Sequence, residues 1–171
     1  MTVHERLPAA RVWSFSRLAL DPDMKLTPPD GTVPTCCAIS FCGNFALLGT
    51  NGGALVKFNL QSGLLRGSSA GSDGGGGGSI SGSPVTADPV TCVACDGCNR
   101  NIITGSASGA VTYWDLKTLA RKDTVFCGPP GVGVTHVRLH NDNNLAAIAR
   151  ADLVVDVHDI VERQVGGWVG G

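Results

Sequence analysis

The segment Cys42–Gly63, CGNFALLGTNGGALVKFNLQSG, has two further copies in this chain of 171 residues. Adding 56 to its numbers gives CNRNIITGSASGAVTYWDLKTL (98–119), and adding a further 44 leads to NNLAAIARADLVVDVHDI (143–160). Each copy contains two short β runs joined by a tight turn, and its second run ends in an aromatic residue or His followed by Asp or Asn. Repeats of about 40 to 45 residues with this ending are typical of the blades of a β-propeller.

Positions shared by the copies are expected to build the blades and not to perform chemistry. Trp13 extends the series backwards, because it lies 45 residues before Phe58. The predicted structural positions are Gly49, Gly105, Phe58, Asn59, Trp114, Asp115, His158, Asp159, the turn residue Asp152, and Trp13. We therefore expect no catalytic, cofactor-binding or metal-binding role for them.

The repeats predict an all-β fold, a partial propeller of about three blades preceded by one leading strand. The expected boundaries are 10–15 for the end of a preceding blade, and 16–66, 90–126 and 132–168 for the three blades. Closed propellers have about four to eight blades, and each blade hides its faces against its neighbours. The sequence therefore predicts a piece of a larger ring.

A Gly- and Ser-rich tract interrupts the repeats at residues 67–89 and accounts for the longer first spacing. It contains five consecutive glycines, Gly74–Gly78, and few apolar residues. Such a composition cannot bury enough apolar surface to offset the entropy lost on ordering. We expect a flexible surface insertion between two blades, without the strand, helix and Lys of a phosphate-binding loop.

Charge and composition favour no nucleic-acid, membrane or extracellular role. The chain has 13 basic and 14 acidic residues without a basic block, seven cysteines, and no apolar segment of membrane-spanning length. Neither a signal peptide nor a glycosylation sequon is visible, and the odd number of cysteines suits a reducing compartment. We expect no membrane partner and no small-molecule substrate.

Some short sequence segments within the repeats are more specific for one family than the general blade pattern is. The stretches CGNFALLGTNGG, FNLQSG, VTCVACDGCNRNIITGSASGAVTYWDLKT and LAAIARADLVVDVHDI resemble the second propeller of one WD-repeat family. That family is the WD-repeat subunit of the UTP-B complex of the small-subunit processome (U-three snoRNP-associated protein twenty-one). The resemblance covers roughly Ala10 to Val165, apart from the Gly tract.

This resemblance implies a non-catalytic nucleolar scaffold that acts in early 18S rRNA maturation. Its partners would be other protein subunits of a pre-ribosomal complex, with contact to pre-rRNA or snoRNA indirect or unknown. The alternative is a generic WD-repeat adaptor of another assembly, such as a ubiquitin-ligase or trafficking complex. The family-specific segments quoted above favour the nucleolar scaffold.

The chain departs from the usual WD-repeat pattern at the polar positions of the blade. Many WD repeats link a Gly-His near the blade start to an Asp in the turn before the Trp-Asp strand. No Gly-His occurs here, and the turn residue is Gly52, Ser108 and Asp152 in successive copies. We therefore expect the polar link to be degenerate and the blades to depend mainly on apolar stacking.

Cysteine and histidine groupings suggest metal sites only superficially. Cys92, Cys95 and Cys98 form C-x-x-C-x-x-C, but residues three apart on a strand point to opposite faces. Cys36 and Cys42 occupy the same repeat positions as Cys92 and Cys98, which suits small buried side chains better than ligands. His136, His140 and His158 are the corresponding zinc candidate, but His136 aligns with Cys92 and His158 with Trp114, both framework positions.

An enzyme built on the propeller is the third hypothesis. The sequence contains no nucleophile elbow, no P-loop and no H-E-x-x-H motif. Asp115 and Asp159 share one repeat position, so they should lie at equivalent ends of different blades and not form a carboxylate pair. We therefore expect no catalysis and no cofactor.

Overall fold

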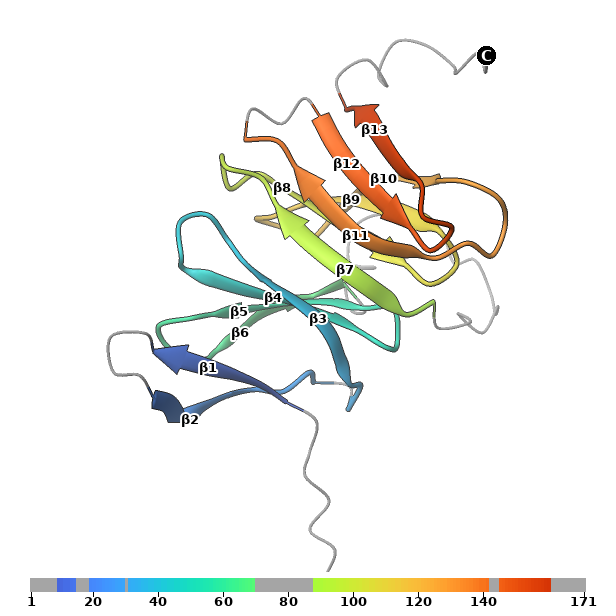
Figure 1. Cartoon of the computed structure of the whole chain (residues 1–171). Helices are drawn as coiled ribbons and strands as arrows, with labels where there is room; N and C mark the ends of the chain where they lie inside the picture. Colours follow the sequence, from blue (N-terminus) through green and yellow to red (C-terminus); the bar gives the residue numbers. More distant parts are fainter. Residues whose placement is uncertain (1–8, 15–18, 30, 70–87, 142–144, 161–171) are drawn as a thin grey trace, which may run out of the picture.

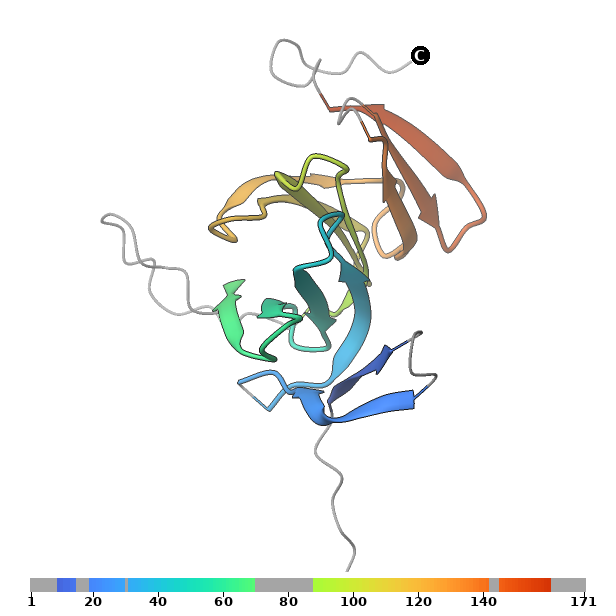
Figure 2. The ribbon, with the colours of Figure 1, turned by 90° about the vertical axis from the view of Figure 1, so that its left-hand side faces the viewer.

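The computed structural model describes residues 9–14, 19–29, 31–69, 88–141 and 145–160, and its regular elements there are all β-strands. Within these ranges the chain forms no helix of sufficient length and apolarity to cross a lipid bilayer. The strands form four antiparallel sheets that follow one another around an arc (Figure 1 and Figure 2). The fold is all-β and corresponds to an arc of a propeller, as the repeats predict.

Each sheet is built from strands that are neighbours in the sequence. The leading sheet consists of β1 (Ala10–Ser14) and β2 (Ala19–Leu26). The first blade consists of β3 (Pro34–Ile39), β4 (Phe45–Thr50), β5 (Leu55–Asn59) and β6 (Leu65–Ser68). The second blade consists of β7 (Val90–Cys95), β8 (Asn101–Ser106), β9 (Ala110–Asp115) and β10 (Arg121–Phe126). The third consists of β11 (Val134–Leu139), β12 (Leu145–Arg150) and β13 (Val155–Asp159).

The boundary expected at residue 16 differs from the observed sheets. Strand β2 pairs with β1, with Ala10 opposite Leu26 and Trp13 opposite Leu20, so it belongs to the leading sheet. The first blade therefore begins at Pro34 and not at residue 16, and the leading sheet has two strands where one was expected.

The Gly-rich insertion and the last blade are described only in part. Gly67 and Ser68 belong to β6, whereas residues 70–87 lie outside the described ranges, as does 161–168 of the predicted third blade.

The three blades share one register as well as one strand order. Cys36 lies opposite Gly49, Cys92 opposite Gly105 and His136 opposite Ala149. One residue earlier, the ladder shifts at Thr35, Thr91 and Thr135, which marks a bulge at the same place in each blade. The offsets of 56 and 44 residues therefore describe equivalent points in space, as the sequence predicts.

The second strand of each of the first two blades is buried on both faces. Leu47 and Leu48 of β4 are both fully buried, and Ile102 and Ile103 of β8 likewise. Because neighbouring side chains point to opposite faces of a sheet, each pair packs in two different interfaces. Leu48 packs towards the leading sheet, whereas Leu47 and Ile102 meet between the first two blades.

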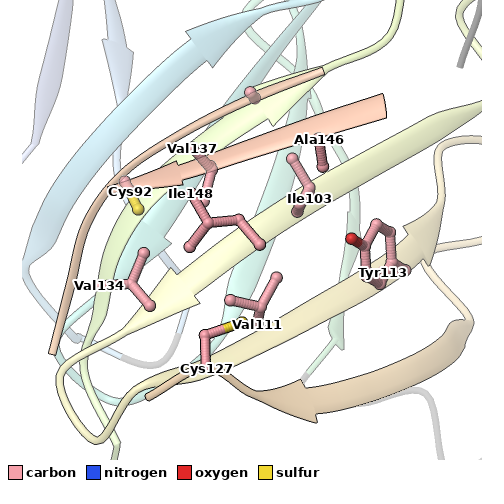
Figure 3. Close-up of a cluster of buried hydrophobic side chains, with 10 residues drawn as sticks. Cys92, Ile103, Val111, Tyr113, Cys127, Val134, Val137, Ala146 and Ile148 are labelled. Atoms are coloured by element: carbon pink, nitrogen blue, oxygen red, sulfur yellow. The ribbon is translucent and has the colours of Figure 1, made fainter. Parts of the chain in front are cut away.

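The interface between the second and third blades forms the largest apolar cluster. Figure 3 shows Ile103 and Val111 of the second blade beside Val137 and Ile148 of the third. All four are buried, so the two sheets exclude water from the face that they share. At about 25 cal/mol per Å² of apolar surface, such burial is the main stabilising term available to these helix-free sheets.

Two glycines allow neighbouring blades to approach closely. A Cβ added at Gly105 would lie 2.7 Å from Cys92 Sγ and nearer still to the side chain of Val134 in the next blade. The same substitution at Gly49 would bring a Cβ to 2.5 Å from Cys36 Sγ and from Val90 Cγ1. Real Cβ atoms do not approach neighbours this closely, so each glycine is required by the blade that follows it.

Replacing Gly105 by Ala should lower the free energy of unfolding by about 3 kcal/mol, because the added methyl group forces two blades apart. The matched control is Gly131→Ala, where nothing lies within 4 Å of the added Cβ and only the positive φ of 82° is unfavourable. That control should cost about 1 kcal/mol. Urea denaturation of the purified full-length protein measures both, and equal losses would show that the close approach is not the constraint.

Candidate functional site

The bulged threonines link each blade to the next through main-chain carbonyls. Thr35 Oγ1 lies 3.1 Å from the carbonyl oxygen of Gly49 and also contacts that of Val90 in the second blade. Thr91 Oγ1 repeats the arrangement, 3.1 Å from the carbonyl oxygen of Gly105 and in contact with that of Val134 in the third blade. A hydroxyl has one proton, so the two carbonyls share it.

These threonines are structural positions that the sequence analysis missed. They recur at the same spacings as the glycines, since 35 plus 56 is 91 and 91 plus 44 is 135. Thr135 Oγ1 likewise donates to the carbonyl oxygen of Ala149, at 3.2 Å. The repeat alignment therefore contained the signal, but Thr is common in strands, and the second carbonyl that Thr35 and Thr91 contact lies in another blade.

Trp114 is held by one polar contact within its own blade. Its indole Nε1 donates to Thr104 Oγ1 at 2.9 Å, which joins β9 to the neighbouring strand β8. Phe58 occupies the same position in the first blade and is 3% exposed, packed in the apolar cluster beneath the leading sheet. The strand of Trp13 pairs as described above, but the side chain of Trp13 lies outside the described part of the structure.

Hydrogen bonds join the loop that precedes a blade to the turn inside that blade. The residues that form them differ from those of the usual WD repeat. Asp88 Oδ1 accepts a hydrogen bond of 3.0 Å from the backbone N–H of Ser108, and Asp88 Oδ2 accepts one from its hydroxyl. In the first blade, Asn51 Oδ1 accepts from the backbone N–H of Val33 at 2.9 Å. The sequence predicts that the usual Gly-His to Asp hydrogen bonds are missing. Other hydrogen bonds take their place, because the carboxylate of Asp88 and the amide oxygen of Asn51 accept from backbone N–H groups.

The turn of the third blade is fixed by an ion pair. Arg150 Nε and Nη2 each lie 3.1 Å from a different oxygen of Asp152, and Arg150 Nη1 lies 2.7 Å from Asp156 Oδ2. Arg150 holds the pKa of the Asp152 carboxyl below its usual value. Asp152 thus holds Arg150 across the turn between β12 and β13.

Asn59 and Asp115 perform one task in two blades. Asp115 Oδ1 accepts hydrogen bonds from the backbone N–H groups of Lys117 and Thr118, at 3.0 and 2.9 Å. Asn59 Oδ1 accepts from Gln61 and Ser62 at 3.0 and 2.9 Å. The N–H of Thr118 is the main cause that lowers the pKa of the Asp115 carboxyl. The residue after the aromatic position therefore closes a turn, and a neutral oxygen suffices.

The cysteines of the C-x-x-C-x-x-C run lie apart, as strand alternation predicts. Cys92 belongs to the cluster between the second and third blades, whereas Cys95 packs on the opposite face, towards the first. Burial raises the pKa of the Cys92 thiol, and it raises that of Cys95 to about 12 and that of Cys36 to about 11. Since metals and electrophiles react with the thiolate, these side chains suit packing and not ligation.

A cavity of about 470 Å³ lies between the second and third blades. Cys127, Arg150, Asp156 and His158 line it, and His158 Nε2 lies 3.8 Å from Cys127 Sγ. The guanidinium charge is already paired with two carboxylates, so the wall offers little net charge to a ligand. His136 on β11 and His140 directly after this strand are both exposed. Within the described ranges no three His, Cys, Asp or Glu side chains are placed to hold a metal ion.

Comparisons with known proteins identify relatives over nearly the whole chain. The family model described as the WDR36/Utp21 second beta-propeller domain matches residues 1–167. The chain is 31% identical over 165 residues to U3 small nucleolar RNA-associated protein 21 homolog of Schizosaccharomyces pombe, covering 96% of this chain and 17% of that protein. It is 31% identical over 137 residues to WD repeat-containing protein 36 of Homo sapiens, covering 80% of this chain and 14% of that protein.

A third relative is U3 small nucleolar RNA-associated protein 21 of Saccharomyces cerevisiae, 27% identical over 165 residues, with 96% of this chain and 16% of that protein covered. The chain thus spans between 14% and 17% of the length of these relatives.

Solved structures show the fold alone, because the identities are low. A chain in the crystal structure of the mitotic checkpoint complex superposes with a TM-score of 0.68 at 18% identity, covering 88% of this chain and 40% of that one. The crystal structure of RRP9 WD40 repeats superposes with a TM-score of 0.62 at 13% identity, covering 77% of this chain and 36% of that one.

Replacing Thr91 by Val should destabilise the protein by about 1–2 kcal/mol, because two buried carbonyl oxygens lose their shared donor. Thr91→Ser keeps the hydroxyl and should recover most of that loss. Equilibrium unfolding in urea compares the variants, and a Ser variant no better than the Val variant would rule out the hydroxyl as the cause.

Replacing Asp115 by Asn should change stability at neutral pH by less than about 1 kcal/mol, whereas Asp115→Ala should cost about 1 kcal/mol more. The depressed pKa of Asp115 means that its charge stabilises the fold above the unfolded-state pKa of about 4. This contribution is lost as the pH falls through the folded-state pKa, and the Asn variant should lack that dependence. Unfolding measured from pH 7 down to pH 3 tests this; an Asn variant with the wild-type pH profile would contradict it.

Iodoacetamide at pH 8 should modify the exposed residues Cys37, Cys42 and Cys98 before Cys36, Cys92 and Cys95. The hydroxyl of Ser40 lowers the pKa of the Cys42 thiol, which favours its reactive thiolate. Peptide mass spectrometry of the native protein measures the order, with the denatured protein as the control in which all seven react. Early modification of Cys92 or Cys95 would refute the packing role.

Proposed function

The chain belongs to the WDR36/Utp21 second beta-propeller family, and on this basis we propose that it is a non-catalytic protein-interaction scaffold of the small-subunit processome, acting in early 18S rRNA maturation. The observation that supports this most is the match of the family model to residues 1–167. Two of the relatives carry U3 small nucleolar RNA association in their names. Its place in the cell would be the nucleolus.

The described side chains suit binding better than catalysis. The repeat positions with polar side chains are engaged in turns and blade contacts, as for Asp115, Asp152 and Trp114. A hydrolase or transferase needs a nucleophile within reach of a base, or a metal, placed in a cavity. In the described ranges, Cys127 Sγ and His158 Nε2 lie 3.8 Å apart in the cavity between the second and third blades, but Cys127 is only 3% exposed.

Partners of the scaffold would be other protein subunits of a pre-ribosomal complex. Propellers bind through loops and blade edges that a rigid ring holds in place. In this chain the ring is stiffened by the threonine bridges and by turns with engaged side-chain oxygens. Association with pre-rRNA or snoRNA would then be indirect.

No observation favours a generic adaptor of another assembly. The superposition on a chain of the mitotic checkpoint complex rests on 18% identity and shows the fold alone. The relatives at 27% to 31% identity instead share one family.

Affinity purification of the tagged full-length protein should recover more U3 snoRNA than the same purification from an untagged strain. Depletion of the protein should lower the amount of 18S rRNA more than the amount of large-subunit rRNA. Fluorescence microscopy of the same tagged protein should place it in the nucleolus. A stable, soluble tagged protein that is excluded from the nucleolus and recovers no U3 snoRNA would refute the proposal. The Gly105→Val variant is a useful control, because separated blades should abolish the association while the tag remains detectable.

A further inference from the structure

A cavity of about 550 Å³ opens between the first and second blades, at the ends of β4, β5 and β9. Its polar lining comes from Lys57, Asn59 and Arg66 of the first blade and from Asn99 and Lys117 of the second. Three of these five side chains are cationic, and none of the residues that line the cavity is acidic. The volume lies within the range of about 300–1,000 Å³ that is usual for ligand sites.

Lys57 places a charge deep in this cavity. The residue is 5% exposed, and its Nζ donates to the carbonyl oxygens of Leu116 and Lys117, at 2.8 and 2.7 Å. An ammonium group has three donors, and these two bonds use two of them. Burial lowers the pKa of Lys57, and the nearby Asp115 carboxylate offsets part of that effect. An anion in the cavity would favour the charged form further.

The remaining donors around Lys57 have no protein acceptors within the described ranges. Arg66 and Lys117 are exposed and form no ion pair with a described residue. Asn99 uses its Oδ1 to accept from the backbone N–H of Cys42 at 2.9 Å, which leaves its Nδ2 donors towards solvent. Asn59 likewise uses its Oδ1 in the turn described above. The cavity therefore presents donors and positive charge, which match a group rich in anionic acceptors.

We propose that this cavity binds an acidic segment of a partner protein, whose Asp or Glu carboxylates meet Lys57, Arg66 and Lys117. The proposal rests on the scaffold function proposed above and specifies the chemistry of one partner. The guanidinium of Arg66 can hold one carboxylate by a bidentate fork, and the ammonium of Lys117 is a point charge for another.

A peptide fits this cavity better than RNA does. Binding of single-stranded RNA combines many phosphate contacts with aromatic faces on which bases stack. The aromatic residue here is Phe45, and Lys57 Nζ lies 5.5 Å from its ring centroid, so the ammonium occupies that face. The chain as a whole has a net charge of −1, which gives no extended track for a phosphate backbone.

Fluorescence anisotropy of a labelled octaglutamate peptide with the purified full-length protein tests the proposal. The double variant Arg66→Glu/Lys117→Glu should weaken binding about tenfold or more, because like charges replace both exposed cations. Lys57 is left unchanged, since its bonds to the second blade contribute to the fold. The matched control is Lys25→Glu/Arg138→Glu, which changes the net charge equally at exposed positions on β2 and β11 and should alter binding less than about twofold.

Equal weakening by the two double variants, or no binding of octaglutamate to the wild type, would overturn the proposal. So would tighter binding of a labelled dodecauridylate that is lost with the same two residues, because the ligand would then be RNA. Thermal unfolding verifies that all variants are folded. The anisotropy measurements use the purified protein alone. Failure of the tagged protein to recover U3 snoRNA would therefore refute the scaffold function, whereas the peptide result would be judged separately.

Discussion

The close approach of neighbouring blades at Gly49 and Gly105 is the constraint on which the rest of the structure depends. At both sites the strand backbone lies against a valine of the next blade, in the space where a Cβ would otherwise be. Because the blades approach so closely, the hydroxyls of Thr35 and Thr91 can contact a carbonyl oxygen in the following blade. The apolar faces of the two blades pack together beside the same contact. Apolar packing and hydrogen bonding therefore stabilise the same interface.

Polar side chains mark the edges of the arc, where the sheets meet solvent. Asp88 and Asn51 join loops to turns, while Asp115 and Asn59 close the turns at the strand ends. Asn and Asp can both fill these positions, because each supplies an oxygen to backbone donors that lie beyond the ladder. This explains why the usual WD-repeat residues can be replaced without loss of the blade.

The candidate binding site lies in the space between the first two blades. Lys57 illustrates the point, since the bonds that bury it are made to the second blade although the residue belongs to the first. Arg66 approaches the same cavity from a further strand of the first blade, and Lys117 approaches it from a turn of the second. Such a cavity exists only when the two blades are stacked, because both blades supply its lining.

The sequence by itself determined the repeat, the all-β arc and the equivalent positions of the copies, because these are set by local periodicity along the chain. It misplaced β2, since a strand's sequence does not say which neighbour completes its ladder. The tertiary structure alone decided the threonine bridges, the bond of Asp88 to Ser108 and the cavity around Lys57. Their partners are 20 to 60 residues apart, and which carbonyl meets a hydroxyl or an ammonium depends on how tightly two finished sheets stack.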